Sequence, residues 1–436
     1  MTRHFVLAGL FLVLAACGKQ EPSSSPAATD PAPSADTAPV ATTERDQFTH
    51  SNYEDVRVTH VDLDLDVDFD ERVLAGTATL DLEYLDRSVG ELVLDTNDLE
   101  ITQVEARTDD WQAVKFELGP DAEPLGAPLT IALPEGTQSV RITYRTDPGA
   151  AGLQWLTPAQ TAGKEHPFLF SQNQAIHARS MVPIQDTPAV RLTYSATLRT
   201  PPELLAVMSA EQDPDGTRDG EYHFSMPQPI PAYLIALAIG DIAFEAIDER
   251  IGVYAEPSVV GAAAREFADT PQMAEANIAL YGPYRWGRYD MIVLPPSFPF
   301  GGMENPRLTF LTPTLIAGDK SLTNVVAHEL AHSWSGNLIT NTTWRDAWLN
   351  EGFTSYVENR VMEALYGVER ATMERALDFE TLRKDVAEAE RPELTQLKMP
   401  ADLAHPDEAF SQVSYVKGAF FLKFLEQRFG REVFDP

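Results

Sequence analysis

Residues 324–356 read NVVAHELAHSWSGNLITNTTWRDAWLNEGFTSY and contain an H-E-x-x-H pattern that runs from His328 to His332. Two histidines four positions apart on a helix are separated by about 400°, so both imidazoles project from one face. That spacing allows one nitrogen of each ring to bind the same zinc ion. Glu329, beside the first histidine, is placed to take a proton from a metal-bound water. The stretch therefore predicts one Zn²⁺ ion per chain, held on a helix.

The same stretch supplies a third metal ligand. Asn350-Glu351-Gly352 falls on a second helical segment, and Glu351 offers a carboxylate oxygen. Three protein ligands with an open fourth position are typical of a catalytic zinc site, whereas a structural site is normally closed by four. The alternative is a pair of surface histidines on an ordinary helix. The Asn350-Glu351-Gly352 motif argues against it, because a third ligand on a second helical segment rarely arises by chance. Zinc-dependent hydrolysis is the predicted chemistry.

The composition is that of a globular protein with room for two or three domains. The chain has 436 residues, of which 44% are hydrophobic and 23% are charged. Its formal net charge is −33. Such acidity argues against nucleic-acid binding and against electrostatic attachment to anionic lipid.

The N-terminus has the pattern of a targeting segment. Basic residues precede an apolar run over 5–16, which is too short to span a bilayer but suits a signal-peptide core. The run ends in LAACG, which resembles the lipobox of bacterial lipoproteins, so residues 1–17 are predicted as a lipoprotein signal peptide with lipid on Cys17. The alternative is an ordinary signal peptide with an incidental cysteine. Cys17 is the only cysteine, which excludes a disulfide within the chain.

Residues 18–46 are rich in Pro, Ser, Ala and Thr and nearly lack large apolar side chains. Such a segment cannot bury enough surface to fold, so it is predicted to be a disordered tether. Anchor and tether together predict a lipid-anchored protein of the bacterial cell envelope that faces the periplasm. Gly18, rather than Asp, after the cysteine favours the outer membrane by resemblance to the usual sorting pattern.

Residues 47–245 carry strand patterns. Residues 61–69 alternate strictly, with apolar side chains on one face and four aspartates on the other, and a second strand-like run follows over 73–85. The aspartate row is expected to be a solvated surface rather than a metal site. Similar short runs recur at 91–94, 140–144 and 189–198. This part is predicted to form an N-terminal β-sandwich-like domain.

The pattern changes over residues 246–436. Helical periodicity appears at 262–280, followed by a strand at 290–294, the predicted zinc helix, the segment that carries Glu351, and further helices. The chain is therefore predicted to be an α+β multidomain protein, with a mixed α/β zinc catalytic domain in its second half.

Three stretches resemble the gluzincin zinc aminopeptidases, in particular their leukotriene A(4) hydrolase-like branch. They are Gly301-Gly302-Met303-Glu304-Asn305, the zinc motif with its distant glutamate, and Ser414-Tyr415-Val416-Lys417-Gly418. The resemblance runs from about residue 47 to the end and implies a thermolysin-like catalytic domain. It implies hydrolysis of the N-terminal residue from short peptides that have a free N-terminus.

The resemblance also implies roles for residues outside the zinc motif. Gly301, Gly302 and Met303 would form a strand edge along which the substrate lies, and Glu304 would bind its α-ammonium group. Gln174, in SQNQA, would help bind the same end; the alternative is a buried, structural glutamine. Tyr415 would donate to the oxyanion that forms during hydrolysis.

Two departures from the family pattern bear on function. Asp407 matches an acid implicated in epoxide hydrolysis by vertebrate members, but Phe410 stands where those members have a tyrosine, which weakens that reading. Relatives continue with a helical domain that supplies an arginine for the carboxylate end of peptides. The sequence ends at Pro436, so that domain is expected to be absent and the catalytic domain incomplete. An epoxide hydrolase and a truncated, non-catalytic peptide-binding lipoprotein are the alternative functions.

Overall fold

The computed structural model describes residues 44–436. The predicted signal peptide, Cys17 and most of the predicted tether lie outside the described residues. Asp46, assigned to the tether, is buried and accepts a hydrogen bond from the Thr187 hydroxyl at 2.7 Å. The last residues of the predicted tether therefore belong to the folded body. From Glu44 onward, no helix combines the length and the apolar character needed to cross a membrane.

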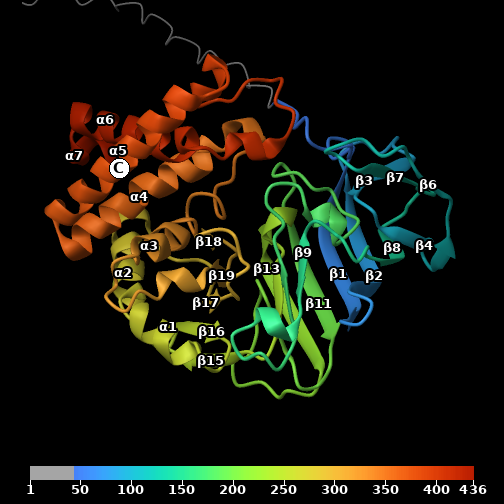
Figure 1. The fold of residues 1–436 in the computed structure, drawn as a ribbon. Coiled ribbons are helices and arrows are strands. Elements are labelled where there is room, and N and C mark those ends of the chain that lie inside the picture. Colours follow the sequence, from blue (N-terminus) through green and yellow to red (C-terminus); the bar gives the residue numbers. More distant parts are fainter. Residues whose placement is uncertain (1–43) are drawn as a thin grey trace, which may run out of the picture. The chain divides into compact units, whose positions relative to one another are not determined.

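Three sheets build the N-terminal half (Figure 1). The seven-stranded sheet has the order β13 (Glu221–Ile230), β11 (Leu192–Arg199), β1 (Val56–Asp68), β2 (Val73–Tyr84), β8 (Ser139–Arg145), β4 (Glu100–Arg107), β5 (Trp111–Ala113). The four-stranded sheet has the order β12 (Leu205–Met208), β14 (Leu237–Gly240), β10 (Phe168–Ser171), β9 (Leu153–Leu156). The three-stranded sheet has the order β3 (Glu91–Thr96), β7 (Ala127–Ala132), β6 (Phe116–Leu118). Apolar side chains from all three sheets share one core, which confirms the β-sandwich-like prediction.

Strand β1 shows why the sequence folds this way. Val61, Leu63 and Leu65 are buried, while the intervening aspartates are exposed. Alternate side chains of a strand point to opposite faces, so the apolar set enters the core and the acidic set meets water. Arg199 of β11 pairs with Asp64 at 2.5 Å and with Asp66 at 3.6 Å. The aspartate row is therefore a solvated surface with ion pairs, as predicted.

The second half contains a five-stranded sheet, with the order β15 (Ala243–Ala246), β16 (Ile251–Ala255), β17 (Tyr289–Val293), β19 (Leu308–Leu311), β18 (Gly302–Met303). The predicted boundary at 245/246 falls inside β15, which pairs with β16 and so belongs to this sheet. The helical stretch predicted over 262–280 is two helices, α1 (Val260–Glu266) and α2 (Thr270–Tyr281). Pro271 explains the break, because proline is tolerated only in the first turn of a helix.

Helices pack beside this sheet and carry most of the predicted site. They are α3 (Asn324–Ala331), α4 (Trp348–Tyr366), α5 (Val368–Glu388), α6 (Gly418–Phe429) and α7 (Arg431–Phe434), with a π-helical turn η8 (Val413–Lys417) before α6. A Cβ on Gly352 of α4 would lie 2.8 Å from the Cα of Gly418, so only glycine permits this approach. The close crossing brings η8, with Tyr415, against the first turn of α4, with Glu351.

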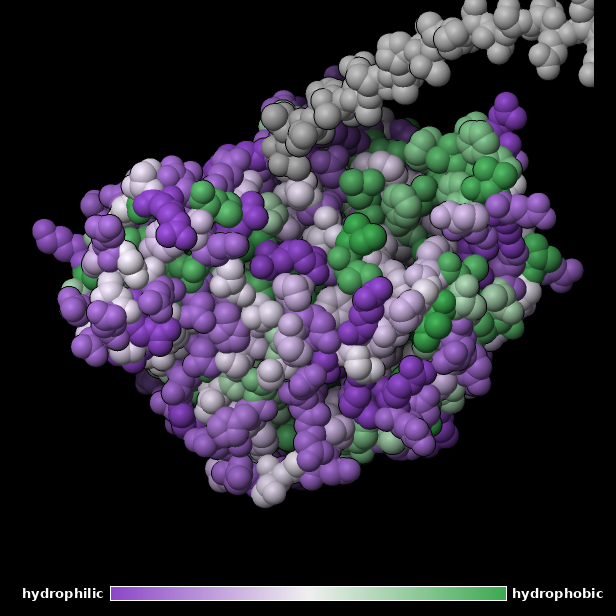
Figure 2. Space-filling view, turned by 180° about the vertical axis from the view of Figure 1, so that it is seen from behind, coloured by the Kyte–Doolittle hydropathy of each residue, from purple (hydrophilic) through white to green (hydrophobic). Residues whose placement is uncertain are grey.

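Exposed apolar side chains gather on α5, α6 and α7. They appear at the upper right of Figure 2, on a face that is otherwise largely polar. The most exposed are Val368, Leu377, Phe424, Phe429 and Val433. The rest of this face is largely polar, as expected for a chain with a formal net charge of −33.

Candidate active site

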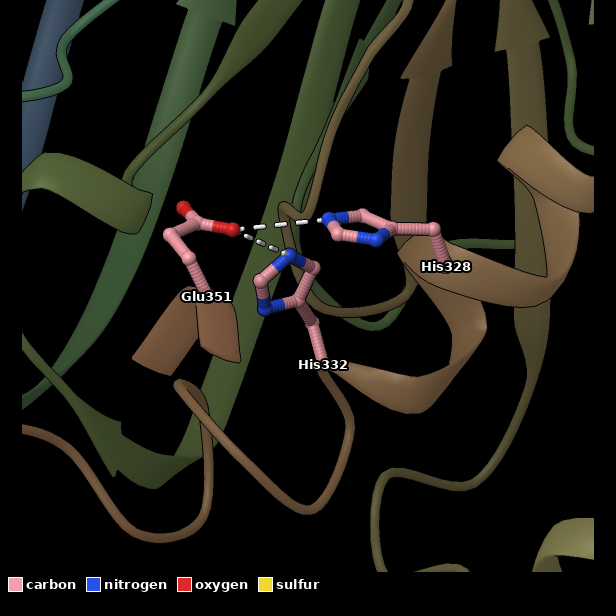
Figure 3. A group of neighbouring side chains, drawn as sticks. All are labelled: His328, His332 and Glu351. Atoms are coloured by element: carbon pink, nitrogen blue, oxygen red, sulfur yellow. Dashed lines mark ion pairs between the residues drawn. The ribbon is translucent and has the colours of Figure 1, made fainter. Parts of the chain in front are cut away.

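The three predicted zinc ligands converge on one point (Figure 3). Oε2 of Glu351 lies 3.4 Å from Nε2 of His328 and 3.4 Å from Nε2 of His332. A tetrahedral zinc ion with ligand bonds of roughly 2.0–2.2 Å holds neighbouring ligand atoms about 3.3–3.5 Å apart. Oε2 of Glu351 is also buried without a hydrogen-bond partner in the described part of the chain. Because the spacing and the unpaired oxygen both match, these residues fit a zinc ion.

Local structure explains how the two histidines reach that point. Val326, Ala327 and Leu330 bury one face of α3 against the sheet. His332 follows the last residue of α3 but keeps helical backbone angles, φ −57° and ψ −20°, so it remains one turn from His328. Both rings therefore face Glu351 across the gap between α3 and α4.

A carboxylate and an amide orient the two rings. Nδ1 of His328 lies 3.0 Å from Oε2 of Glu358, whose other oxygen accepts a hydrogen bond from Asn324 at 3.1 Å. Nδ1 of His332 lies 2.8 Å from Oδ1 of Asn350. These acceptors place the proton of each ring on Nδ1 and leave Nε2 free to bind metal.

The sequence analysis did not predict that Glu358 and Asn350 orient the two histidines. Glu358 lies seven positions after Glu351, about 700° around α4, so both carboxylates occupy one helix face. That spacing was the signal available in the sequence. Asn350 is the first residue of the Asn-Glu-Gly motif, but its contact with His332 follows only from the tertiary structure.

Glu329 is buried beside the zinc ligands. Its Oε2 has no hydrogen-bond partner among residues 44–436, and burial raises its pKa to about 7. A Cβ added to Gly302 would overlap the Glu329 carboxylate. Gly302 must therefore be glycine because the carboxylate occupies the space of a side chain at that position.

Glu304 lies close to Glu329 and His332. Ligand atoms of Glu304, Glu329 and His332 lie within 4.8 Å of one another. Oε1 of Glu304 accepts a hydrogen bond from Nε2 of Gln174 at 3.1 Å and from Nδ2 of Asn350 at 3.5 Å. Gln174 comes from the N-terminal β domain, so residues of both halves build this end of the site.

Strand β18 borders the site. It is the edge strand of its sheet, pairing with β19 on one side only. Gly301 and Gly302 line the adjoining cavity, and Sδ of Met303 accepts a hydrogen bond from Gln172 at 3.3 Å. An edge strand facing a cavity can pair with an extended peptide through its main-chain groups.

Tyr415 lies beside His328, one of the three residues that fit a zinc ion. Its ring stacks on His328, with ring centroids 5.9 Å apart and an interplanar angle of 25°. Burial and the carboxylates of Glu351 and Glu304 raise the pKa of Tyr415 well above its usual value. The hydroxyl therefore stays protonated and can act as a hydrogen-bond donor.

Asp407 and Phe410 line the same cavity, which has a volume of about 990 Å³. The Asp407 side chain is 56% exposed and lies 3.4 Å from Nδ1 of His405. Asp407 is therefore on the cavity wall, apart from the buried carboxylates. Phe410 packs on Trp344, with ring centroids 5.6 Å apart.

Two family models match the sequence. The Peptidase M1 N-terminal domain matches residues 52–234, and the Peptidase family M1 domain matches residues 268–436. Leucine aminopeptidase 2 of Yarrowia lipolytica is 44% identical, over 90% of this chain and 62% of its own length. Leukotriene A-4 hydrolase of Xenopus laevis is 42% identical, over 88% of this chain and 64% of its own length. The chain thus spans less than two thirds of the length of these relatives.

Solved structures agree with the fold. Yeast LTA4 hydrolase in complex with bestatin superimposes with a TM-score of 0.86 at 39% identity, covering 92% of this chain and 63% of that one. The M1 zinc metallopeptidase of Deinococcus radiodurans superimposes with a TM-score of 0.67 at 21% identity, covering 88% and 84%. At 21% identity, the similarity to the Deinococcus radiodurans structure supports the fold only.

Proposed function

Because the chain belongs to peptidase family M1, we propose that it is a zinc-dependent aminopeptidase that removes the N-terminal residue from short peptides. The observation that carries this proposal is the position of Glu304. A buried carboxylate lies beside the metal ligands and is held by Gln174 at 3.1 Å. Such a group pairs with a free α-ammonium and aligns the first peptide bond with the metal.

His328, His332 and Glu351 would hold the zinc ion. When bound, zinc supplies Lewis-acid polarisation of the scissile carbonyl and lowers the pKa of a coordinated water. Glu329 removes a proton from the attacking water and transfers it to the leaving amine. Tyr415 donates a hydrogen bond to the oxyanion that develops on the substrate. Glu304 and Gln174 fix the ammonium group, so cleavage is restricted to the first residue.

Epoxide hydrolysis is the second candidate, since a relative is named leukotriene A-4 hydrolase. Asp407 is present, but Phe410 offers no hydroxyl to the cavity that both residues line. A non-catalytic peptide-binding protein is the third candidate. The buried, unpaired Glu329 argues against it, because a buried carboxylate without a partner is costly unless chemistry requires it.

For the location, we propose a lipid anchor on Cys17 that holds the enzyme in the bacterial cell envelope, at the periplasmic face of the outer membrane. The support is the LAACG sequence after an apolar run and the Pro-rich and Ser-rich segment that follows. The net charge of −33 also argues against a nucleic-acid partner. Cys17→Ser should abolish incorporation of labelled fatty acid and move the protein out of the membrane fraction. Unchanged labelling would exclude the anchor.

Hydrolysis of an aminoacyl-arylamide tests the enzymatic proposal. The chain should cleave the free-amine substrate and leave its N-acetylated form intact, and a chelator should remove the activity. Equal cleavage of both forms would exclude an exopeptidase that reads the amino terminus. Tight binding of free-amine peptides without turnover would favour the peptide-binding alternative.

A further inference from the structure

Tyr233 is a buried residue that the proposed mechanism does not use. It lies in the 3-10 turn η3 (Ala232–Leu234), between β13 and β14, and its side chain is only 1% exposed. Its hydroxyl is buried and has no hydrogen-bond partner within residues 44–436. Leaving a buried hydroxyl unpaired costs roughly 1–3 kcal/mol, so the presence of this one calls for an explanation.

Tyr233 interacts electrostatically with two carboxylates of the site, Glu304 and Glu351, and with the guanidinium of Arg191. Burial raises the pKa of Tyr233 well above its usual value, the negative charges of Glu304 and Glu351 raise it further, and the positive charge of Arg191 lowers it. The phenol is therefore neutral and retains its proton. It can thus act as a hydrogen-bond donor.

One oxygen of the Glu304 carboxylate is available to accept a hydrogen bond from such a donor. Both amide hydrogen bonds to its carboxylate, from Gln174 and Asn350, go to Oε1. In the described chain, Oε2 receives no hydrogen bond from protein. The main chain of Glu304 is fixed separately, because its carbonyl accepts a hydrogen bond from Asn337 at 2.7 Å. In the carboxylate of Glu304, Oε1 therefore accepts two hydrogen bonds, whereas Oε2 accepts none from the described chain.

Packing against Trp344 holds the ring of Tyr233 in place. The Tyr233 ring meets the Trp344 ring edge to face, with centroids 5.1 Å apart, and Trp344 is itself buried. Trp344 begins the short turn η5 (Trp344–Asp346) that leads into α4 and Glu351. Tyr233 is not among the residues that line the cavity, so it is not placed to contact a substrate bound there.

We propose that Tyr233 is a positioning residue whose hydroxyl donates to the Glu304 carboxylate, directly or through one water, and holds it towards the substrate's α-ammonium group. This inference rests on the proposed aminopeptidase function and deepens it. It makes selection for a free amino terminus depend on a tyrosine of the β domain as well as on Gln174.

Tyr233→Phe in the full chain tests the inference. The KM for a free-amine arylamide should rise about tenfold to a hundredfold, the range for losing a hydrogen bond to a charged group. The kcat should change far less, zinc content should stay at the wild-type level, and affinity for an N-acetylated peptide should not change. Tyr144→Phe is the matched control, because Tyr144 also has a buried hydroxyl without a partner in the described chain.

The structural alternative gives a different result. If the hydroxyl had no role in positioning, its removal would leave KM unchanged and stability equal or higher. An unchanged KM, or the loss of folding in Tyr233→Phe with Tyr144→Phe intact, would therefore overturn the proposal. In a Glu304→Gln background, Tyr233→Phe should have little further effect, and fully additive effects would also overturn it.

Calorimetry separates failure of this inference from failure of the proposed function. If the wild-type chain does not hydrolyse arylamides, the proposed activity fails. Binding of a free-amine dipeptide amide and of its N-acetylated form can still be compared in wild type and Tyr233→Phe. A preference for the free amine that survives the substitution would reject the role of Tyr233 whatever the outcome of the activity assay.

Discussion

Nδ1 of His328 lies 3.0 Å from the carboxylate of Glu358, two turns of α4 beyond the ligand Glu351. One helix thus supplies both a metal ligand and the group that orients another ligand. His332 is oriented differently, by the neutral amide of Asn350 at 2.8 Å. The two histidines therefore differ in the charge of their outer partners, and their contributions to metal affinity can be separated.

Glu358→Ala should weaken zinc binding by about 10–100-fold, because His328 loses the acceptor that fixes its ring and tautomer. Competition with a chromogenic chelator measures the affinity. Glu369→Ala, at an exposed position of α5, is the control and should bind zinc like the wild type. Wild-type affinity in Glu358→Ala would show that Glu358 does not orient the ligand.

Glu329→Gln should reduce kcat by about 10²–10⁴-fold, because the amide cannot accept the proton from the attacking water. Zinc content should remain at one ion per chain, since Glu329 is not one of the three converging ligands. Metal analysis and steady-state kinetics on the same sample test both statements. Retention of most of the activity would exclude Glu329 as the general base.

Tyr415→Phe should lower kcat by about 10²–10³-fold with little change in KM, because the hydroxyl binds the oxyanion more strongly than the ground-state carbonyl. The ring stack on His328 should persist in the phenylalanine variant, so zinc affinity should be unchanged. A rise in KM with normal kcat would instead indicate a role in substrate binding.

Gly302→Ala should strongly reduce activity, because the new Cβ would overlap the Glu329 carboxylate and displace it. Gly301→Ala, at the residue directly before β18, is the matched control. There a Cβ would meet only Cγ1 of Val325 at 3.5 Å, an ordinary contact. Steady-state kinetics of the pair, with thermal melts to verify folding, test the difference, and equal activities would exclude the steric argument.

Asp46→Asn should make the unfolding free energy less sensitive to pH. Burial raises the pKa of Asp46 from 3.8 to about 6. The protonated carboxyl therefore contributes its full share to the unfolding free energy below pH 3.8, and this contribution is lost as the pH rises through 6. The stability of Asp46→Asn relative to wild type should increase by about 2 kcal/mol between pH 4 and pH 7. Urea unfolding across this range, with exposed Asp70→Asn as control, provides the measurement. A pH-independent difference would contradict the assignment.

Local patterns predicted much of the fold, because they depend on periodicity. The alternation in residues 61–69 predicted both the buried and the exposed face of β1, and the comparisons confirm the family and the fold class. The break between α1 and α2 was missed because an apolar pattern can continue across a short interruption. The boundary placed at 245/246 falls inside β15, because local composition does not show to which sheet a strand pairs.

By itself, the sequence determined the donor set of His328, His332 and Glu351, the adjacent Glu329, and the helical spacing that turns two histidines to one side. These follow from residue type and local geometry. Only the tertiary structure decided that Oε2 of Glu351 lies 3.4 Å from both ring nitrogens, that Glu358 and Asn350 orient the rings, and that the hydroxyl of Tyr233 is buried without a partner in the described chain. The reason is physical: these relationships join segments far apart in the chain, and packing between them sets the distances.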